Sequence, residues 1–151
     1  MPKGIELFRE KFAAHTDKYV LIGGTACELA MQEANLDFRA TKDLDIVLTI
    51  ETLDPIFSTL FWEFVEAGGY EHQRAGTEGK PQCYRFIKPK DATYPYMLEL
   101  LSHSPGLMHA PAGRPITRIH ADGDTASLSA ILMDEAYYAL VQSHRRIIDG
   151  L

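Results

Sequence analysis

The chain has 151 residues, of which 46% are hydrophobic and 24% are charged, and its formal net charge is −6. This composition excludes a disordered or fibrous class, and the length predicts a single domain over residues 1–151. The negative charge argues against a broad nucleic-acid-binding surface, because such surfaces are usually basic. No apolar stretch is long enough to span a bilayer, so we expect a soluble, cytoplasmic protein without a membrane contact.

The N-terminal residues predict a helix followed by a buried strand. Ile5, Phe8 and Phe12 recur at helical spacing, which predicts an amphipathic helix over residues 4–15. The short apolar run over residues 19–22 is rich in residues that favour extended structure, and it predicts a buried strand.

Two glycines separate this strand from a second predicted helix. Gly23 and Gly24 predict a tight turn, and good helix formers follow over residues 25–36. Thr25, with Glu28 three residues later, matches the capping-box pattern that marks the start of a helix. We therefore expect a strand, a glycine turn and a helix in direct succession.

Alternating residues predict a second strand over residues 43–50. Successive side chains of a strand point to opposite faces. The face expected to contact the core carries Leu44, Ile46, Leu48 and Ile50. The other face carries Asp43, Asp45, Val47 and Thr49.

The rest of the chain predicts a mixture of helices and strands. A helix over residues 53–67 has Pro55 in its first turn and ends at Gly68 and Gly69. From residue 128, the spacing of the apolar residues predicts another helix that runs towards residue 148. Extended segments are predicted between these helices over residues 83–87, 96–101 and 116–120. Together these elements predict an α/β (α+β) domain.

Asp43 and Asp45 are the first candidate site residues. Their spacing on a strand places both carboxylates on one side, within reach of a single ion. Two such charges repel each other, so the pair shares a proton, contacts a basic side chain, or holds a hard cation that prefers oxygen ligands. A solvated strand end beside Lys42 and Arg39 is the alternative that the spacing alone leaves open.

The turn formed by Gly23, Gly24 and Thr25 is a candidate phosphate site. A turn without side chains lets a phosphate approach backbone N–H groups, and the start of the following helix favours negative charge. The Thr25 hydroxyl is then a candidate contact for a phosphate oxygen. The alternative is that Thr25 only caps its own helix.

Glu99 is the third candidate, because it interrupts the apolar run over residues 96–101. An ionised carboxylate in a buried strand is costly unless it is neutralised. A metal shared with Asp43 and Asp45 is one candidate for this role. An ion pair with Arg85, in the neighbouring predicted strand, is the other, and the residues alone favour neither.

The segment over residues 20–48 has the sequence VLIGGTACELAMQEANLDFRATKDLDIVL. It resembles the signature of the nucleotidyltransferase superfamily, in which a hydrophobic residue and Gly-Gly or Gly-Ser precede a helix, and Asp-hydrophobic-Asp or Asp-hydrophobic-Glu lies on the next strand. It is most similar to the bacterial branch that includes the nucleotidyltransferase-like toxins of the AbiEii type. The specific pieces are the Gly-Gly-Thr turn and the run from Arg39 through Thr41 to Asp45.

The resemblance implies a single nucleotidyltransferase-like domain with a mixed β-sheet flanked by helices. It implies an enzyme that transfers the NMP group of ATP or another nucleoside triphosphate to a hydroxyl acceptor. Gly23, Gly24 and Thr25 are implied to bind the nucleotide. Arg39 and Lys42 are candidates for further phosphate contacts, with screening of the aspartates as the alternative.

The resemblance also implies a metal site. Asp43 and Asp45, together with a third acid on a later strand, are implied to hold Mg²⁺ or Mn²⁺ and to be catalytic. We assign the third acid to Glu99, which is also a candidate general base. In the superfamily this third acid is more usually Asp.

The partners that follow from the resemblance are less defined. The acceptor is RNA, a protein or a small molecule, and both an antitoxin partner and a homo-oligomer are compatible with a toxin–antitoxin role. The competing hypothesis is a catalytically inactive module of the same fold that acts by binding a partner. It is motivated by a glutamate at position 99, where the superfamily more usually has Asp, and by the end of the chain at Leu151. A metal-dependent phosphohydrolase is a third hypothesis.

Overall fold

The computed structural model describes residues 3–37, 42–72, 84–103, 116–119, 128–148 and 150–151. Its helices are α1 (Ile5–Phe12), the short 3-10 helix η1 (Ala13–His15), α2 (Gly23–Glu33), α3 (Pro55–Gly68) and α4 (Glu135–Ser143). Its strands are β1 (Tyr19–Ile22), β2 (Asp43–Leu48), β3 (Glu71–His72), β4 (Arg85–Ile87), β5 (Met97–Ser102), β6 (Ile116–Ile119) and β7 (Leu128–Leu132). In this part of the chain no helix has the length and apolar character needed to cross a membrane.

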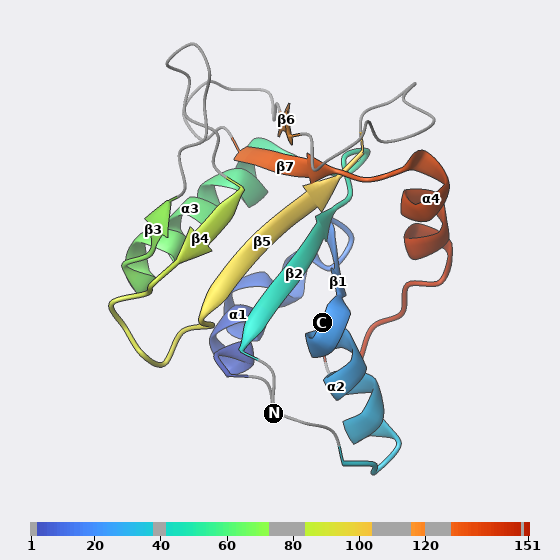
Figure 1. Cartoon of the computed structure of the whole chain (residues 1–151), viewed down its shortest axis with the longest axis horizontal. Coiled ribbons are helices and arrows are strands. Elements are labelled where there is room, and N and C mark those ends of the chain that lie inside the picture. Colours follow the sequence, from blue (N-terminus) through green and yellow to red (C-terminus); the bar gives the residue numbers. More distant parts are fainter. Residues whose placement is uncertain (1–2, 38–41, 73–83, 104–115, 120–127, 149) are drawn as a thin grey trace.

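The described strands form one mixed sheet (Figure 1). Its main path has the order β1-β2-β5-β4-β3, and β7 pairs with both β5 and β6. β2 is antiparallel to β1 and parallel to β5, whereas β4 is antiparallel to β5. β7 pairs with β5 at Leu101 and Ser102, beyond the residues of β5 that pair with β4. The expected mixed sheet is therefore present, and β1 lies at one end of its main path.

Helices α1 and α3 cover one face of this sheet (Figure 1). Their aromatic side chains pack closely, and the rings of Phe8 and Phe12 have centroids 4.5 Å apart. The strand residues buried against them are Tyr19, Leu44, Ile46, Leu48, Phe86, Leu98 and Leu100. Burial of each large apolar side chain contributes about 1.5 to 3 kcal/mol, so this layer determines which face of the sheet is turned inwards.

The opposite face of the sheet is covered unevenly. Near the end of β2, Val47 is buried in a second apolar cluster with Met133 and Tyr138, against which Leu101 packs. Near the start of β2, Asp43 is exposed and Asp45 is half-buried. The second apolar cluster therefore covers the end of β2 but not its start, where the two aspartates lie.

Helix α3 begins and ends at residues suited to these positions. The Asp54 carboxylate accepts a hydrogen bond from the Phe57 backbone N–H at 2.8 Å, and Pro55 occupies the first turn. Gly69 ends the helix in the left-handed conformation, with φ +67°. Both boundaries agree with the sequence prediction to within two residues.

Two predictions for the helices are wrong. The predicted helix from residue 128 is replaced by β7 and then α4, because the residues of β7 pair with β5 and β6. The predicted capping box at Thr25 is also absent. α2 begins at Gly23, so Ile22 occupies the capping position, and no side chain caps the helix.

Candidate functional site

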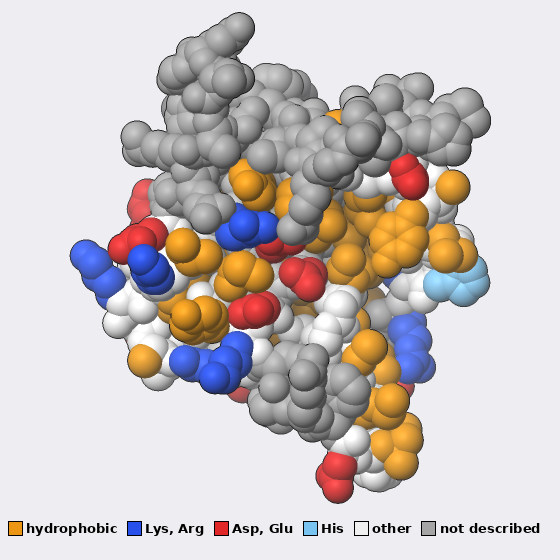
Figure 2. All heavy atoms as spheres, in the orientation of Figure 1, with side chains coloured by type: hydrophobic (Ala, Val, Ile, Leu, Met, Phe, Trp, Pro, Cys, Tyr) orange, Lys and Arg blue, Asp and Glu red, His pale blue; other side chains and the backbone are white. Residues whose placement is uncertain are grey.

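Three charged residues lie in one row across the sheet. Asp45 of β2 pairs with Glu99 of β5, and Glu99 pairs with Arg85 of β4. Residues paired on neighbouring strands project from the same face, here the face opposite α1 and α3. Figure 2 shows acidic side chains gathered over β2 and β5, with a basic side chain beside them over β4. The fold thus brings Asp45 and Glu99 side by side.

The glycine turn lies directly beside Asp45. Ile22, the last residue of β1, pairs with Asp45, and Gly23 follows at once. Gly23 has φ +71°, and a Cβ at this position would lie 2.6 Å from Asp45 Oδ2. Only glycine permits both this conformation and this close approach without a shift of the neighbouring atoms. The turn and one of the predicted metal-binding carboxylates therefore meet at the end of β1.

Glu99 is held by Arg85. Glu99 is only 6% exposed to solvent. Arg85 Nε donates a hydrogen bond to Glu99 Oε2 at 2.8 Å, and Arg85 Nη2 forms an ion pair with the same oxygen at 2.7 Å. A charge-assisted pair of this kind offsets much of the cost of burying the carboxylate. The sequence left two partners open for Glu99, a metal and Arg85, and the structure shows the contact with Arg85.

Thr25 connects α2 to the beginning of β2. It is 1% exposed, and its Oγ1 donates a hydrogen bond to the backbone carbonyl oxygen of Asp43 at 2.7 Å. In this conformation the hydroxyl proton is used within the protein, so a phosphate contact by Thr25 stays a prediction without support from this geometry. Lys42 precedes β2 and is exposed, and Arg39 lies outside the described residues.

The carboxylates fit a metal ion only in part. Asp43 and Asp45 share one strand face, and Mg²⁺ often uses only one or two protein carboxylates together with phosphates and water. Glu99, by contrast, is neutralised by Arg85. Within the described ranges, no group of three or more His, Cys, Asp or Glu side chains is arranged to hold a metal. The aspartate pair therefore fits a metal that shares its ligands with a nucleotide, whereas a centre of three protein carboxylates is not formed in this conformation.

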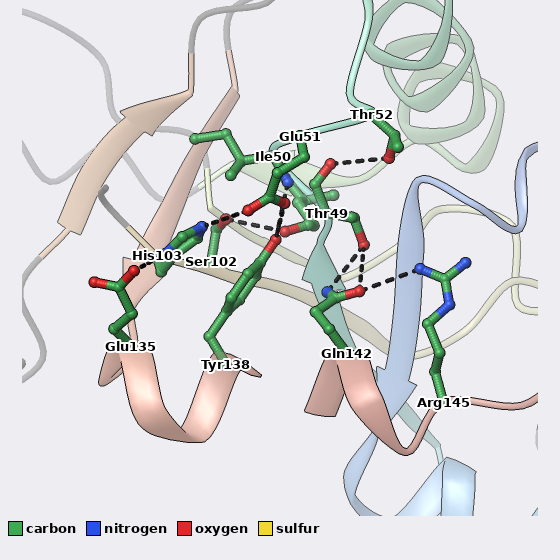
Figure 3. Close-up of polar contacts among 11 residues, drawn as sticks. Thr49, Ile50, Glu51, Thr52, Ser102, His103, Glu135, Tyr138, Gln142 and Arg145 are labelled. Atoms are coloured by element: carbon green, nitrogen blue, oxygen red, sulfur yellow. Dashed lines mark hydrogen bonds and ion pairs between the residues drawn. The ribbon is translucent and has the colours of Figure 1, made fainter. Parts of the chain in front are cut away.

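A polar network that the sequence did not predict lies beyond the ends of β2 and β5 (Figure 3). His103 is buried, and its Nε2 lies 3.1 Å from Glu51 Oε1. The Tyr138 hydroxyl donates to Glu51 Oε2 at 2.5 Å and accepts from the Ile50 backbone N–H at 3.2 Å. The imidazole of His103 stacks on the Tyr138 ring, with centroids 3.7 Å apart. The network thus ties α4 to the ends of two central strands.

The network also changes the acidity of its carboxylate. Partial burial alone would raise the pKa of Glu51, but hydrogen bonds from Tyr138, from its own backbone and from His103 together lower it below the ordinary value. No spacing along the chain indicates these contacts, because Glu51, His103 and Tyr138 lie far apart in sequence. The contacts of His103 with Glu51 and Tyr138 give this buried histidine a structural position.

Comparisons with known proteins give no independent support for a family. No family model matches the chain, and no curated protein and no solved structure matches it either.

Proposed function

We propose that the chain is a metal-dependent nucleotidyltransferase that moves the NMP group of a nucleoside triphosphate to a hydroxyl of RNA, a protein or a small molecule. The observation that carries this proposal is the contact between Gly23 and the Asp45 carboxylate. It joins the two separate parts of the sequence resemblance, the glycine turn and the aspartate pair, in one place. A coincidental similarity of two short motifs would not require them to touch.

The beginning of α2 supplies the expected phosphate contacts. The first N–H groups of a helix have no partner within the helix and carry partial positive charge. The first turn of α2 contains no acidic residue, and Gly23 and Gly24 leave its backbone without side chains. Phosphate oxygens bound by these N–H groups would be near the Asp45 carboxylate, which Gly23 approaches closely. Lys42 and Arg39 are proposed as further contacts to the triphosphate.

Asp43 and Asp45 would hold Mg²⁺ or Mn²⁺ together with phosphate oxygens of the nucleotide. When bound, the metal neutralises charge that develops on the transferred phosphoryl group and on the leaving pyrophosphate. The protein contributes the position of the two carboxylates, which β2 places on one face, and the approach of the glycine turn. Glu99 acts as a metal ligand or general base only in a state in which it has exchanged Arg85 for another partner.

One specific observation favours a second candidate function. The Arg85–Glu99 ion pair and the hydrogen bond from Thr25 to Asp43 both direct predicted site groups towards contacts within the protein. A catalytically inactive module of this fold, acting by partner binding, accounts for these contacts directly. The two candidates differ in whether a nucleotide binds with metal and whether its NMP group is transferred.

Calorimetric titration with ATP, GTP, CTP and UTP in the presence of Mg²⁺ tests the proposal. We expect one nucleotide to bind in a metal-dependent way, with affinity reduced by about tenfold or more, roughly 1.4 kcal/mol, in Asp43→Asn and in Asp45→Asn. Glu10→Gln removes an exposed carboxylate from α1, on the other side of the sheet, and serves as the matched control. If no nucleotide binds to the correctly folded protein, the proposal is wrong.

Transfer is tested separately from binding. Incubation with nucleotides labelled at the α-phosphate should move label to an acceptor in a cell extract, and Asp45→Asn should abolish this transfer. Binding without transfer, together with a stable complex with another protein, would favour the inactive module. Release of free phosphate or NMP without a labelled acceptor would instead indicate a phosphohydrolase.

A further inference from the structure

A large pocket lies at the edge of the sheet beside β1. Its volume is about 640 Å³, and its walls come from α2, from β1 and from α4 with the residues that follow it. Figure 1 shows α2 and α4 on the same side of the sheet, next to β1. Pockets that hold small organic ligands are typically about 300 to 1,000 Å³. The pocket is therefore large enough for such a molecule.

The walls of the pocket are mainly apolar. Small side chains of α2, Ala26 and Ala30, leave the space open on one side. Leu21 of β1 and Ile148 line it on the other sides, and both also pack against the main core. An apolar body placed between these walls would be removed from water, which favours its binding.

The charged side chains that line the pocket are all basic. The charged lining residues are Arg145 and Arg146, which follow His144 on the segment after α4, and none of the described lining residues is acidic. Arg145 is held in place, because its guanidinium donates to Gln142 Oε1 at 3.1 Å and to the Thr16 carbonyl oxygen at 2.8 Å. In a chain with a net charge of −6, this local concentration of basic residues favours an anionic group in the occupant.

Two further features belong to the same region. Arg146 forms an ion pair with Glu33 at the end of α2, with Nη2 and Oε2 3.0 Å apart, so the pair joins the two sides of the pocket. Tyr19 also lines the pocket, and its buried hydroxyl has no hydrogen-bond partner among the described residues. A buried hydroxyl without a partner is unusual in native proteins.

We propose that this pocket binds a small amphipathic anion, a molecule with an apolar acyl or aromatic body and one acidic group near Arg145 and Arg146. Figure 2 shows the corresponding surface, where basic side chains lie between the hydrophobic surfaces of α4 and α2. The pocket shares Gly23 with the proposed nucleotide site, whereas Asp43, Asp45 and Glu99 do not line it. Binding in the pocket can therefore be tested without a nucleotide or a metal.

Calorimetric titration with decanoate is the direct test, with 1-decanol as the neutral ligand and butyrate as the short anion. We expect saturable binding of decanoate to one site and binding of both comparison ligands that is weaker by about tenfold or more. Arg145→Gln should weaken the binding of decanoate and leave that of 1-decanol unchanged. Equal binding of decanoate and 1-decanol, or no effect of Arg145→Gln, would overturn the assignment of an anionic ligand.

A pocket-filling variant locates the site. Ala30→Phe places a ring in the pocket and should reduce decanoate affinity by about tenfold or more. Ala139→Phe makes the same change on the exposed side of α4, outside the pocket, and should leave the affinity unchanged. Thermal unfolding of both variants establishes that they are folded. Absence of saturable decanoate binding by the wild-type protein, or equal affinity of folded Ala30→Phe, would show that the proposal is wrong.

Cys27 gives a second measurement that needs no pocket-filling variant. It is an exposed free thiol that lines the pocket. Decanoate should slow its alkylation by iodoacetamide in the wild-type protein, with the modified peptide identified by mass spectrometry to separate Cys27 from Cys83. Unchanged alkylation of Cys27 at saturating decanoate would contradict binding in this pocket.

Discussion

The Cα atom of Gly23 lies so close to the carboxylate of Asp45 that a Cβ at residue 23 would be 2.6 Å from Asp45 Oδ2. The glycine directly follows β1 and begins α2, and the aspartate lies opposite Ile22, the last residue of β1. The contact therefore depends on the antiparallel pairing of the two strands and on the absence of a side chain at residue 23. The candidate site therefore has this geometry only when β1 and β2 pair as they do in this fold.

Gly23→Ala should destabilise the protein by about 1 to 3 kcal/mol, because it combines a positive φ with a close contact. Gly24→Ala is the matched control, since Gly24 lies in α2 without a positive φ and alanine favours helix. Urea unfolding gives the free energy of unfolding of both variants. The double variant Gly23→Ala with Asp45→Ala should recover the part of the loss that comes from the contact, and strict additivity would contradict this explanation.

Arg85→Met should lower the free energy of unfolding by about 2 to 3 kcal/mol, because it removes the guanidinium that pairs with the buried Glu99 carboxylate. The double variant Arg85→Met with Glu99→Leu should regain most of this loss, since no buried charge remains. Lys88→Met is the control, because Lys88 and Glu71 form an exposed pair with atoms 3.8 Å apart. Its effect should stay within about 0.5 kcal/mol. Equal losses for Arg85→Met and Lys88→Met would contradict a buried ion pair.

Tyr138→Phe should reduce stability near neutral pH and have a smaller effect in acid. The hydrogen bonds to Glu51 lower its pKa below 4.5, so they stabilise the fold fully above this value. Their contribution is lost as the pH falls through the lowered pKa. The pH-dependent part should not exceed about 1 kcal/mol, because the Glu51 side chain is 58% exposed and screened by solvent.

Unfolding measured from pH 7 down to below pH 4.5 checks this dependence on Tyr138. Tyr137→Phe removes a hydroxyl from the neighbouring exposed residue and should show no comparable change with pH. A constant difference between Tyr138→Phe and the wild-type protein over the whole range would mean that the Glu51 carboxylate contributes nothing to the effect.

Tyr19→Phe and Tyr70→Phe should have opposite effects on stability. Both residues are buried, but the Tyr19 hydroxyl has no hydrogen-bond partner among the described residues, whereas the Tyr70 hydroxyl donates to the Pro95 carbonyl oxygen. Removal of the Tyr19 hydroxyl should leave stability unchanged or raise it by about 1 kcal/mol. Removal of the Tyr70 hydroxyl should lower stability by about 1 kcal/mol. Denaturation of the two variants side by side decides the prediction, and a larger loss for Tyr19→Phe would contradict it.

Local patterns determined most of the elements that surround the candidate site. The alternation over residues 43–50 predicted which face of β2 is buried, and Leu44, Ile46 and Leu48 are indeed in the core. The helix around Pro55 and the strand before Gly23 were predicted for similar reasons. Such features depend on the period of the backbone and on the conformational preferences of single residues, both of which are properties of the sequence itself.

The segment from residue 128 shows where local patterns fail. The apolar spacing of Leu128, Ile131 and Leu132 is compatible with a helix, yet the residues form β7 because β5 and β6 offer hydrogen-bonding partners. Short apolar segments fit both periods, so contacts with distant residues decide between them. The same reason explains why β3 and the Glu51 network were not predicted.

The sequence by itself determined an α/β chain with a glycine turn, an aspartate pair on one strand face and a buried Glu99. Only the tertiary structure decided which groups meet, because the partner of a buried charge depends on strand order and register. In the fold Gly23 lies against Asp45, and Glu99 forms an ion pair with Arg85. The fold also forms a pocket beside β1 with mainly apolar walls and two arginines. Residues far apart in the chain carry no local signal of such contacts, and they become neighbours only when the sheet forms.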